Sequence, residues 1–216
     1  MPAAQDPHRG QPALRYGPAP SEARLTTILV HGRGDSAEGI LGLAHALEPD
    51  DIAYLAPEAA GRTWYPYSFL APIEQNEPYL TSALLVVDRL LEALGQQGVP
   101  PERIVLMGFS QGACLSFEYA ARHARRYAAV IGLSGGLIGP PGTAREYPGS
   151  FDGAPVFLGC SDVDAHIPVE RVKESAAVFR RMGAAVDERI YPGMGHTTNA
   201  DEIAAVNALL RTVPGA

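Results

Sequence analysis

Ser110 stands in a sequence context that suits an activated hydroxyl nucleophile. It lies in the pentapeptide Gly-Phe-Ser-Gln-Gly, residues 108–112, which follows the apolar run 104–107 and precedes a helical pattern. A serine on a tight turn from strand to helix holds its hydroxyl above the edge of a sheet. Gly108 and Gly112 remove side chains that would collide where the backbone reverses. The pattern therefore predicts that Ser110 is the nucleophile of a serine hydrolase.

A second Gly-x-Ser-x-Gly match is centred on Ser134. It also follows an apolar run, 128–133, but the residues after it, 137–149, are rich in proline and glycine. Proline and glycine at this density exclude a helix. Ser134 therefore lacks a helix amino terminus that could face a developing oxyanion, and we predict that it is a loop serine.

The base that Ser110 needs is predicted to be His196, one of six histidines in the chain. His196 lies in a glycine-rich loop after the last predicted strand and before the last predicted helix. In α/β-hydrolases the residues follow one another along the chain as serine, acid and histidine. His166 also follows Ser110, but only His196 leaves room for an acid after a preceding strand.

The acid that orients the imidazole is expected at the carboxyl end of the apolar run 156–158. Asp162 and Asp164 both lie there. Such an acid holds the histidine in one tautomer and stabilises the imidazolium ion. Spacing alone does not choose between the two aspartates. The other one is expected to cap the next helix or to brace the loop.

The elements that must position these residues alternate along the chain. Apolar runs rich in β-branched residues predict strands at 26–30, 52–56, 104–107, 128–133, 156–158 and 188–191. Helical patterns cover 36–47, 79–94, 113–122, 169–182 and 199–210. Short strands that are apolar on both faces and alternate with helices predict an α/β fold: a doubly wound, mostly parallel sheet with helices on both faces.

The first 22 residues differ from the rest of the chain. They are rich in proline, glycine and alanine and show no periodicity. We therefore predict a flexible tail over 1–22, which contains His8, with one short edge strand around 14–16. Residues 23–216 are predicted to form one domain of the α/β-hydrolase type, without a separate cap domain.

Composition limits the class of protein. Of the 216 residues, 46% are hydrophobic and 19% charged, which is enough material for a core. The formal net charge of -7 disfavours a nucleic-acid partner and attachment to anionic membranes. We expect no membrane span and no signal peptide, and hence a cytoplasmic protein. Cys114 and Cys160 are expected to be buried free thiols. The sequence does not fix the oligomeric state, and a homo-oligomer is one of the open alternatives.

One long connection, residues 57–78, is expected to carry function, because structureless loops of about twenty residues are uncommon. It contains the only tryptophan, Trp64, together with Tyr65, Tyr67 and Phe69. Trp64, Tyr65 and Phe69 are predicted to bind substrate as a wall or partial lid. An ordinary packed surface loop is the alternative.

Five stretches together resemble the phospholipase/carboxylesterase family, which includes acyl-protein thioesterases and small bacterial carboxylesterases. They are Leu-Val-His-Gly-Arg-Gly-Asp at 29–35, the pentapeptide around Ser110, Ser-Gly-Gly at 134–136, Asp-Val-Asp-Ala-His-Ile-Pro at 162–168 and Gly-Met-Gly-His at 193–196. The resemblance implies that Asp164 is the acid. It also implies an oxyanion hole formed by the backbone N–H groups of Arg33 and Gln111, with His31 holding the loop.

The implied function is hydrolysis of small-molecule carboxylic esters, with short or medium acyl chains or aromatic groups, through an acyl-enzyme. No metal and no organic cofactor are expected. The alternatives are an acyl-thioesterase, a lysophospholipase, a dienelactone-hydrolase-like enzyme and a non-catalytic relative that binds a small ligand. Dienelactone hydrolases usually carry cysteine where this chain has Ser110, and non-catalytic relatives usually lose one member of the triad.

Overall fold

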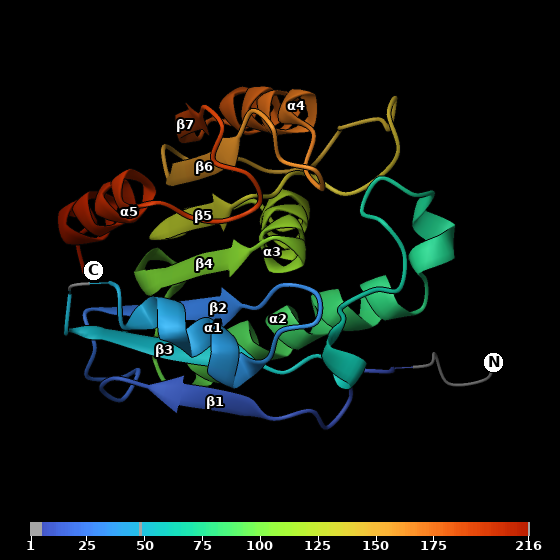
Figure 1. Ribbon diagram of the computed structural model, residues 1–216. Coiled ribbons are helices and arrows are strands. Elements are labelled where there is room, and N and C mark those ends of the chain that lie inside the picture. Colours follow the sequence, from blue (N-terminus) through green and yellow to red (C-terminus); the bar gives the residue numbers. More distant parts are fainter. Residues whose placement is uncertain (1–5, 48, 216) are drawn as a thin grey trace.

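Seven strands form one sheet, with the mostly parallel arrangement that the sequence predicts (Figure 1). The computed structural model describes residues 6–47 and 49–215. The strands are β1 (Ala13–Tyr16), β2 (Leu25–Val30), β3 (Ile52–Pro57), β4 (Ile104–Phe109), β5 (Ala129–Leu133), β6 (Pro155–Ser161) and β7 (Ala185–Tyr191). Their order across the sheet is β1-β3-β2-β4-β5-β6-β7, and only β1 runs antiparallel to its neighbour. This order and the covering helices confirm the α/β-hydrolase fold.

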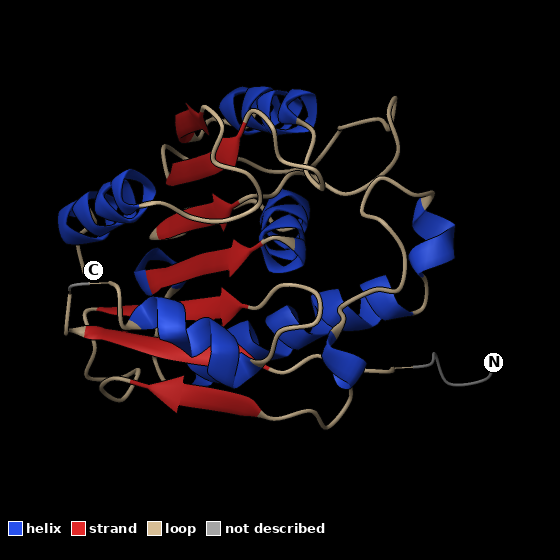
Figure 2. Cartoon of the chain, in the orientation of Figure 1, coloured by secondary structure: helices blue, strands red, loops and turns tan. Residues whose placement is uncertain are grey.

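Helices cover both faces of the sheet (Figure 2). They are α1 (Ala37–Ala44), α2 (Tyr79–Gln96), α3 (Gln111–Arg122), α4 (Val169–Arg181) and α5 (Ala200–Thr212), with short 3-10 turns at Ala60–Arg62, Ile73–Asn76 and Pro101–Arg103. Helices α1 and α5 pack on one face, and α2, α3 and α4 on the other. None of the helices in the described segments is long and apolar enough to cross a bilayer.

Alternating side chains of the central strands divide the core into two layers. In β2, Ile28 and Val30 belong to the layer beneath α2, α3 and α4, whereas Leu29 packs toward α1 and α5. Successive side chains of a strand point to opposite faces, so a strand covered on both sides must be apolar throughout. This explains why the apolar runs of the sequence located the central strands.

Strand β7 is longer than the sequence predicted, because the predicted strand 188–191 covers only its second half. It lies at the edge of the sheet, and Ala185 and Asp187 are exposed. Polar residues are tolerated on the open face of an edge strand, so hydrophobicity alone underestimates such strands.

The amino-terminal segment differs from the predicted flexible tail over its described part. Strand β1 is the expected edge strand and pairs with β3. His8, only 1% exposed, has its Nε2 atom 2.9 Å from the Trp64 carbonyl oxygen. Its backbone N–H donates to Ser82 Oγ over 2.9 Å. The partners of His8 lie more than fifty residues away in sequence, which composition could not reveal; residues 1–5 of the predicted tail lie outside the described residues.

Glu202 is a buried carboxylate in the first turn of α5. Its side chain is fully buried against Gly159 of β6, where an added Cβ would lie 1.9 Å from Glu202 Oε1. Neither carboxyl oxygen accepts a hydrogen bond of normal length from the described part of the chain. Burial raises the pKa of Glu202 to about 7, although the backbone N–H of Asn199 opposes the shift.

Glu202 is therefore expected to make stability depend on pH. The folded state binds this proton more tightly than the unfolded chain, whose glutamate pKa is about 4.3. The contribution is full below that value and is lost as pH rises through about 7. The free energy of unfolding of Glu202→Gln, taken relative to that of the wild type, should rise by about 3 kcal/mol from pH 4.5 to pH 8. Urea unfolding at both pH values measures it. The exposed first-turn glutamate of α4 gives the control, Glu170→Gln, which should keep the wild-type pH dependence; equal behaviour of both variants would contradict the prediction.

Candidate active site

Ser110 occupies the turn between β4 and α3 in a strained conformation. Its φ is 55° and its ψ -119°, a region that residues other than glycine rarely adopt. A Cβ at Gly108 would lie 2.4 Å from the carbonyl carbon of Gly112, and one at Gly112 would lie 2.1 Å from the Val30 carbonyl oxygen. The turn therefore requires both glycines, for the steric reason inferred from the sequence.

Ser134 does not lie on such a turn. It follows β5 with a φ of 53°, and its side chain is buried. No helix begins after it before α4 at Val169. Ser134 thus has neither exposure nor a helix amino terminus, as predicted from the prolines and glycines that follow it.

His196 and Asp164 form a continuous hydrogen-bonded chain with Ser110. His196 Nε2 lies 2.8 Å from Ser110 Oγ. His196 Nδ1 lies 2.7 Å from Asp164 Oδ2. These three side chains come from the loops after β4, β6 and β7, which all end at the same edge of the parallel sheet. The arrangement can transfer a proton from the serine hydroxyl to the imidazole while the carboxylate holds the ring.

The Asp164 carboxylate is fixed by more than His196. Its side chain is fully buried, and Oδ1 accepts hydrogen bonds from the backbone N–H groups of His166 and Ile167, at 2.8 and 3.0 Å. Burial raises the pKa of Asp164, but the hydrogen bonds from His196 and the two N–H groups outweigh burial, so the pKa is lowered. The carboxyl group therefore stays ionised, as a partner for an imidazolium ion must.

Asp162 lies nearby but contacts a different group. Its Oδ1 atom accepts a hydrogen bond from the backbone N–H of Gly193 over 2.7 Å. Ser161 Oγ accepts another from Gly195, over 3.0 Å. Both bonds brace the loop that carries His196. The sequence predicted that the aspartate which does not contact the histidine would cap the next helix or brace the loop. Asp162 has the bracing role.

Two backbone N–H groups suited to an oxyanion hole lie beside Ser110. One belongs to Gln111, the first residue of α3, and the other to Arg33 in the loop after β2. A Cβ at Gly32 would be 3.4 Å from the Ser110 Cβ, so this loop lies directly against the serine. Neither N–H donates to an acceptor within the described segments. Such groups are available to stabilise a negative charge that develops on a bound carbonyl oxygen.

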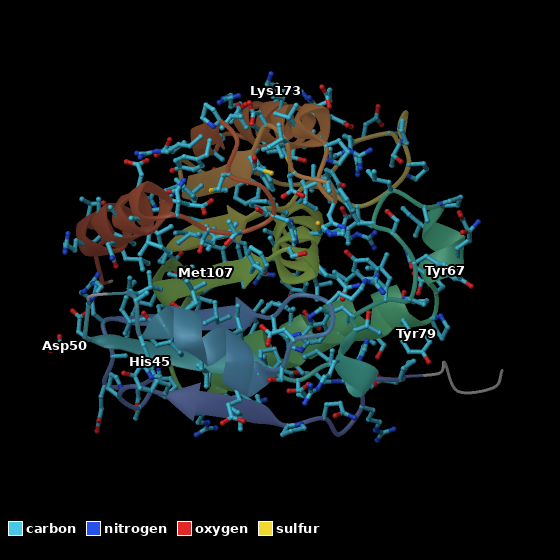
Figure 3. The ribbon with its side chains drawn as sticks, in the orientation of Figure 1. His45, Asp50, Tyr67, Tyr79, Met107 and Lys173 are labelled. Carbon is cyan, nitrogen blue, oxygen red and sulfur yellow. The ribbon has the colours of Figure 1, made fainter. Side chains whose placement is uncertain are left out.

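A cavity of about 360 Å³ opens over Ser110 and His196. The 57–78 loop forms one wall through Tyr65 and Phe69, as predicted, with Tyr67 at the rim. Tyr67 is 57% exposed and points away from the sheet in Figure 3. The loop therefore borders the cavity over Ser110, and binding of substrate by Tyr65 and Phe69 stays a prediction.

Trp64 does not line the cavity, contrary to the prediction. It is fully buried, and its indole N–H donates to the His31 carbonyl oxygen over 2.9 Å. Its backbone N–H donates to Gln111 Oε1, also over 2.9 Å. Trp64 thus ties the loop to the two segments that carry the N–H groups described above. A tryptophan among aromatic residues indicates burial, but sequence does not say whether it faces the core or a ligand.

His31 has the structural place that the resemblance implied. It is fully buried, with Nδ1 2.7 Å from the Gly32 carbonyl oxygen, and Nε2 accepts the Ala59 N–H over 3.1 Å. Because Nε2 accepts, Nδ1 carries the proton and the ring is neutral. The ring therefore fixes the turn that leads to Arg33.

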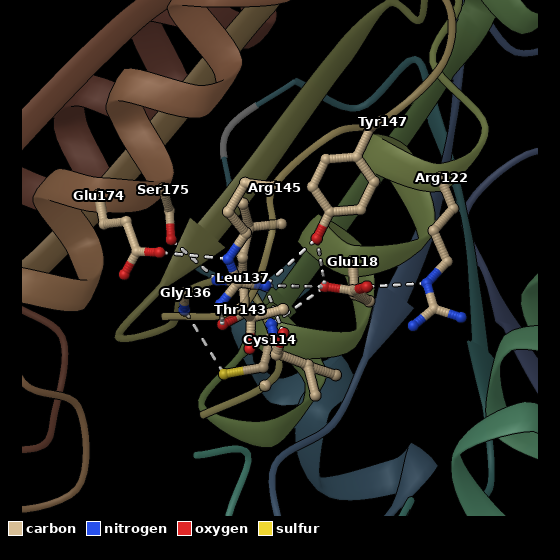
Figure 4. A network of polar contacts seen from close by, with 12 residues as sticks. Cys114, Glu118, Arg122, Gly136, Leu137, Thr143, Arg145, Tyr147, Glu174 and Ser175 are labelled. Carbon is tan, nitrogen blue, oxygen red and sulfur yellow. Dashed lines mark hydrogen bonds and ion pairs between the residues drawn. The ribbon is translucent and has the colours of Figure 1, made fainter. Parts of the chain in front are cut away.

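A largely buried polar network ties α3 to the segment after β5 (Figure 4). Glu118 of α3 accepts hydrogen bonds from the Ile138 N–H, the Tyr147 hydroxyl and Arg122 Nε, at 3.0, 3.1 and 2.7 Å. Arg145 donates to the Ile138 carbonyl oxygen. The proline-rich segment after β5 is thereby held without a helix or strand.

Outside the 57–78 loop, sequence reasoning missed three residues that line the cavity: Cys114, His166 and Ile167. Cys114 follows Ser110 by one helical turn, a spacing that could have indicated it. Burial raises the pKa of its thiol to about 12, so it stays protonated. The His166 ring meets the His196 ring edge-on, with centroids 4.7 Å apart. Its place beside Asp164 was visible in the sequence, but its direction was not.

Comparison with protein families gives one match that spans almost the whole chain. Residues 18–213 match the family described as Phospholipase/Carboxylesterase. Among curated proteins, acyl-protein thioesterase 1 of Gibberella zeae is 28% identical over 226 residues, which covers 90% of this chain and 92% of that protein.

Solved structures with known names also resemble this chain over most of its length. A crystal structure of phospholipase/carboxylesterase from Dyadobacter fermentans superposes with a TM-score of 0.91 at 42% identity, covering 96% of this chain and 99% of that one. A structure of esterase PE8 has a TM-score of 0.77 at 26% identity and covers 94% and 98% of the two chains.

Proposed function

Since this chain belongs to the phospholipase/carboxylesterase family and is a hydrolase of the esterase or thioesterase type, we propose that it hydrolyses carboxylic esters with short or medium acyl chains or aromatic groups. The observation that carries the proposal is the chain of two hydrogen bonds from Ser110 through His196 to Asp164, at 2.8 and 2.7 Å. Three side chains in this order supply a nucleophile, a base and an orienting charge.

The reaction runs in two halves. In the first, Ser110 Oγ attacks the ester carbonyl while His196 Nε2 takes the hydroxyl proton. The N–H groups of Arg33 and Gln111 donate to the oxyanion, each worth about 3 kcal/mol in the transition state. The tetrahedral intermediate then collapses, the bond to the alcohol oxygen breaks, and His196 gives that oxygen the proton. The acyl group is left on Ser110.

Water completes the cycle. It attacks the acyl carbonyl and gives a proton to His196, and the second tetrahedral intermediate expels the Ser110 oxygen, which regains the proton. The buried Asp164 carboxylate keeps the Nδ1 proton of His196 in place throughout and stabilises the imidazolium ion in both halves. Each turnover releases one alcohol and one carboxylic acid.

The size of the cavity supports a preference for short acyl chains. A cavity of about 360 Å³ lies near the lower end of ligand sites, which span about 300–1,000 Å³. We expect kcat/KM for p-nitrophenyl esters to show no gain from the butanoate to the dodecanoate, because methylenes that stay outside the cavity contribute no burial free energy. A steady rise to the dodecanoate would favour the lysophospholipase alternative.

The acyl-thioesterase alternative is favoured by the curated relative of that name. Phenyl butanoate and S-phenyl thiobutanoate form a matched pair that differs only in the leaving atom. We expect a kcat/KM for the oxygen ester that equals or exceeds that of the thioester. A thioester preference of tenfold or more would replace the carboxylesterase proposal by a thioesterase.

A further inference from the structure

The side chain of Arg33 brings a cation to the wall of the cavity, apart from the role of its backbone N–H. We propose that this guanidinium group makes the site select esters that carry an anionic group, of which a carboxylate on the acyl part is the simplest. The inference rests on the proposed ester hydrolysis and specifies its substrate class.

The guanidinium group is held in one position by backbone carbonyl groups. Nη1 donates to the Pro66 oxygen over 2.8 Å, and Nη2 donates to the oxygens of Tyr65 and Tyr67 over 2.9 and 2.7 Å. A guanidinium has five N–H groups, so two stay available to a ligand. Because the side chain is already ordered, little further rotamer entropy is lost when an anion binds.

The charge of Arg33 has no protein counter-ion. Among the described residues, no carboxylate lies within ion-pair distance of its guanidinium group, although the side chain borders the same cavity as Ser110. The three carbonyl groups are dipoles that orient the cation without neutralising it. The guanidinium group can attract a carboxylate by its charge and can donate single hydrogen bonds to it from the N–H groups that remain.

The remaining lining of the cavity brings no carboxylate to offset this charge. Among the described residues it contains no aspartate and no glutamate. Two buried carboxylates are already engaged, Asp164 with His196 and Glu118 with Arg122. The chain as a whole is acidic, with 24 Asp and Glu against 17 Lys and Arg. The lining of the cavity thus holds the permanent cation of Arg33 and no described carboxylate, although the chain as a whole is acidic.

Two esters of equal shape test the inference. Monoethyl succinate carries a carboxylate at pH 7.5, and in ethyl 4-methylpentanoate an isopropyl group of similar size replaces it. Release of acid is followed by titration at constant pH, which reports on both esters alike. We expect the wild type to favour the anionic ester in kcat/KM by about tenfold, a preference that weakens as salt is added.

Three variants locate the origin of this preference. Arg33→Met keeps the backbone N–H but removes the charge. The ratio of kcat/KM for the anionic ester to kcat/KM for the neutral ester should fall about tenfold, so that the preference is lost. Arg33→Lys keeps the charge and should retain most of the ratio. Arg126→Met is the matched control. This exposed arginine also donates to a backbone carbonyl, that of Asp152. It lies before the amino end of β5, whereas the cavity lies at the carboxyl ends of the strands. It should leave the ratio unchanged.

The outcomes separate this inference from the proposed function. If the wild type hydrolyses both esters without preference, or Arg33→Met slows both equally, the anionic specificity is wrong and ester hydrolysis stands. An Arg33→Lys ratio as low as that of Arg33→Met would also overturn the role of charge. If the folded wild type hydrolyses neither of these esters nor any p-nitrophenyl ester, the proposed function fails and the inference fails with it.

Discussion

Replacing Ser110 by alanine is expected to lower kcat for p-nitrophenyl butanoate by about four to six orders of magnitude. Ser110 Oγ is the atom that would form the acyl-enzyme. Without it, His196 Nε2, which lies 2.8 Å from Oγ in the wild type, has no nucleophile to activate. His196→Ala should cost about as much, and the double variant little more, because triad members act as a unit. Initial rates at saturating substrate measure all three.

Ser134→Ala is the matched control for this loss. Ser134 stands in the same five-residue pattern, but it is buried and no helix begins directly after it. Its replacement should change kcat by less than about tenfold, since it touches no reacting atom. A large loss at Ser134 with a small one at Ser110 would reverse the assignment of the nucleophile.

Asp164→Asn is expected to lower kcat by about four orders of magnitude. An amide at this position carries no charge to stabilise the imidazolium ion. It can also present N–H groups to His196 Nδ1, which favours the wrong tautomer, with the proton on Nε2. The backbone N–H groups of His166 and Ile167 would still hold the side-chain oxygen, so the fold should persist. Circular dichroism and thermal unfolding check this, and kcat gives the effect.

Asp162→Asn makes the same chemical change two residues away. The amide oxygen can still accept the hydrogen bond from the Gly193 N–H, so the loop that carries His196 stays braced. A loss below about tenfold is expected, as for most changes at exposed sites. If Asp162→Asn were severe and Asp164→Asn mild, the acid would be Asp162.

The positions of the candidate catalytic residues could be predicted from sequence where local geometry fixes them. The turn at Ser110 needs glycine at 108 and 112 for steric reasons, and its helix begins at once. The same local argument excluded Ser134. His196 followed from chain order, because parallel strands deliver their carboxyl ends to one edge of the sheet.

Contacts between distant segments could not be predicted in this way. Nothing near His8 in sequence indicates that it lies beside Trp64. The centroids of the two rings are 5.4 Å apart. The choice between Asp162 and Asp164 depends on which carboxylate the loop turns inward, which spacing does not encode. Trp64 was expected to bind substrate because it lies in a long aromatic loop, yet adjacent side chains of a loop can face opposite sides.

Covalent labelling with a fluorophosphonate tests the central claim most directly, since it needs no knowledge of the substrate. A serine that is activated by a histidine attacks the phosphorus and displaces fluoride, and the adduct stays on its oxygen. Intact-mass and peptide mass spectrometry should find one adduct, on Ser110, and none in Ser110→Ala. An adduct on Ser134, or hydrolysis of esters by a wild-type protein in which Ser110 stays unlabelled, would contradict the account.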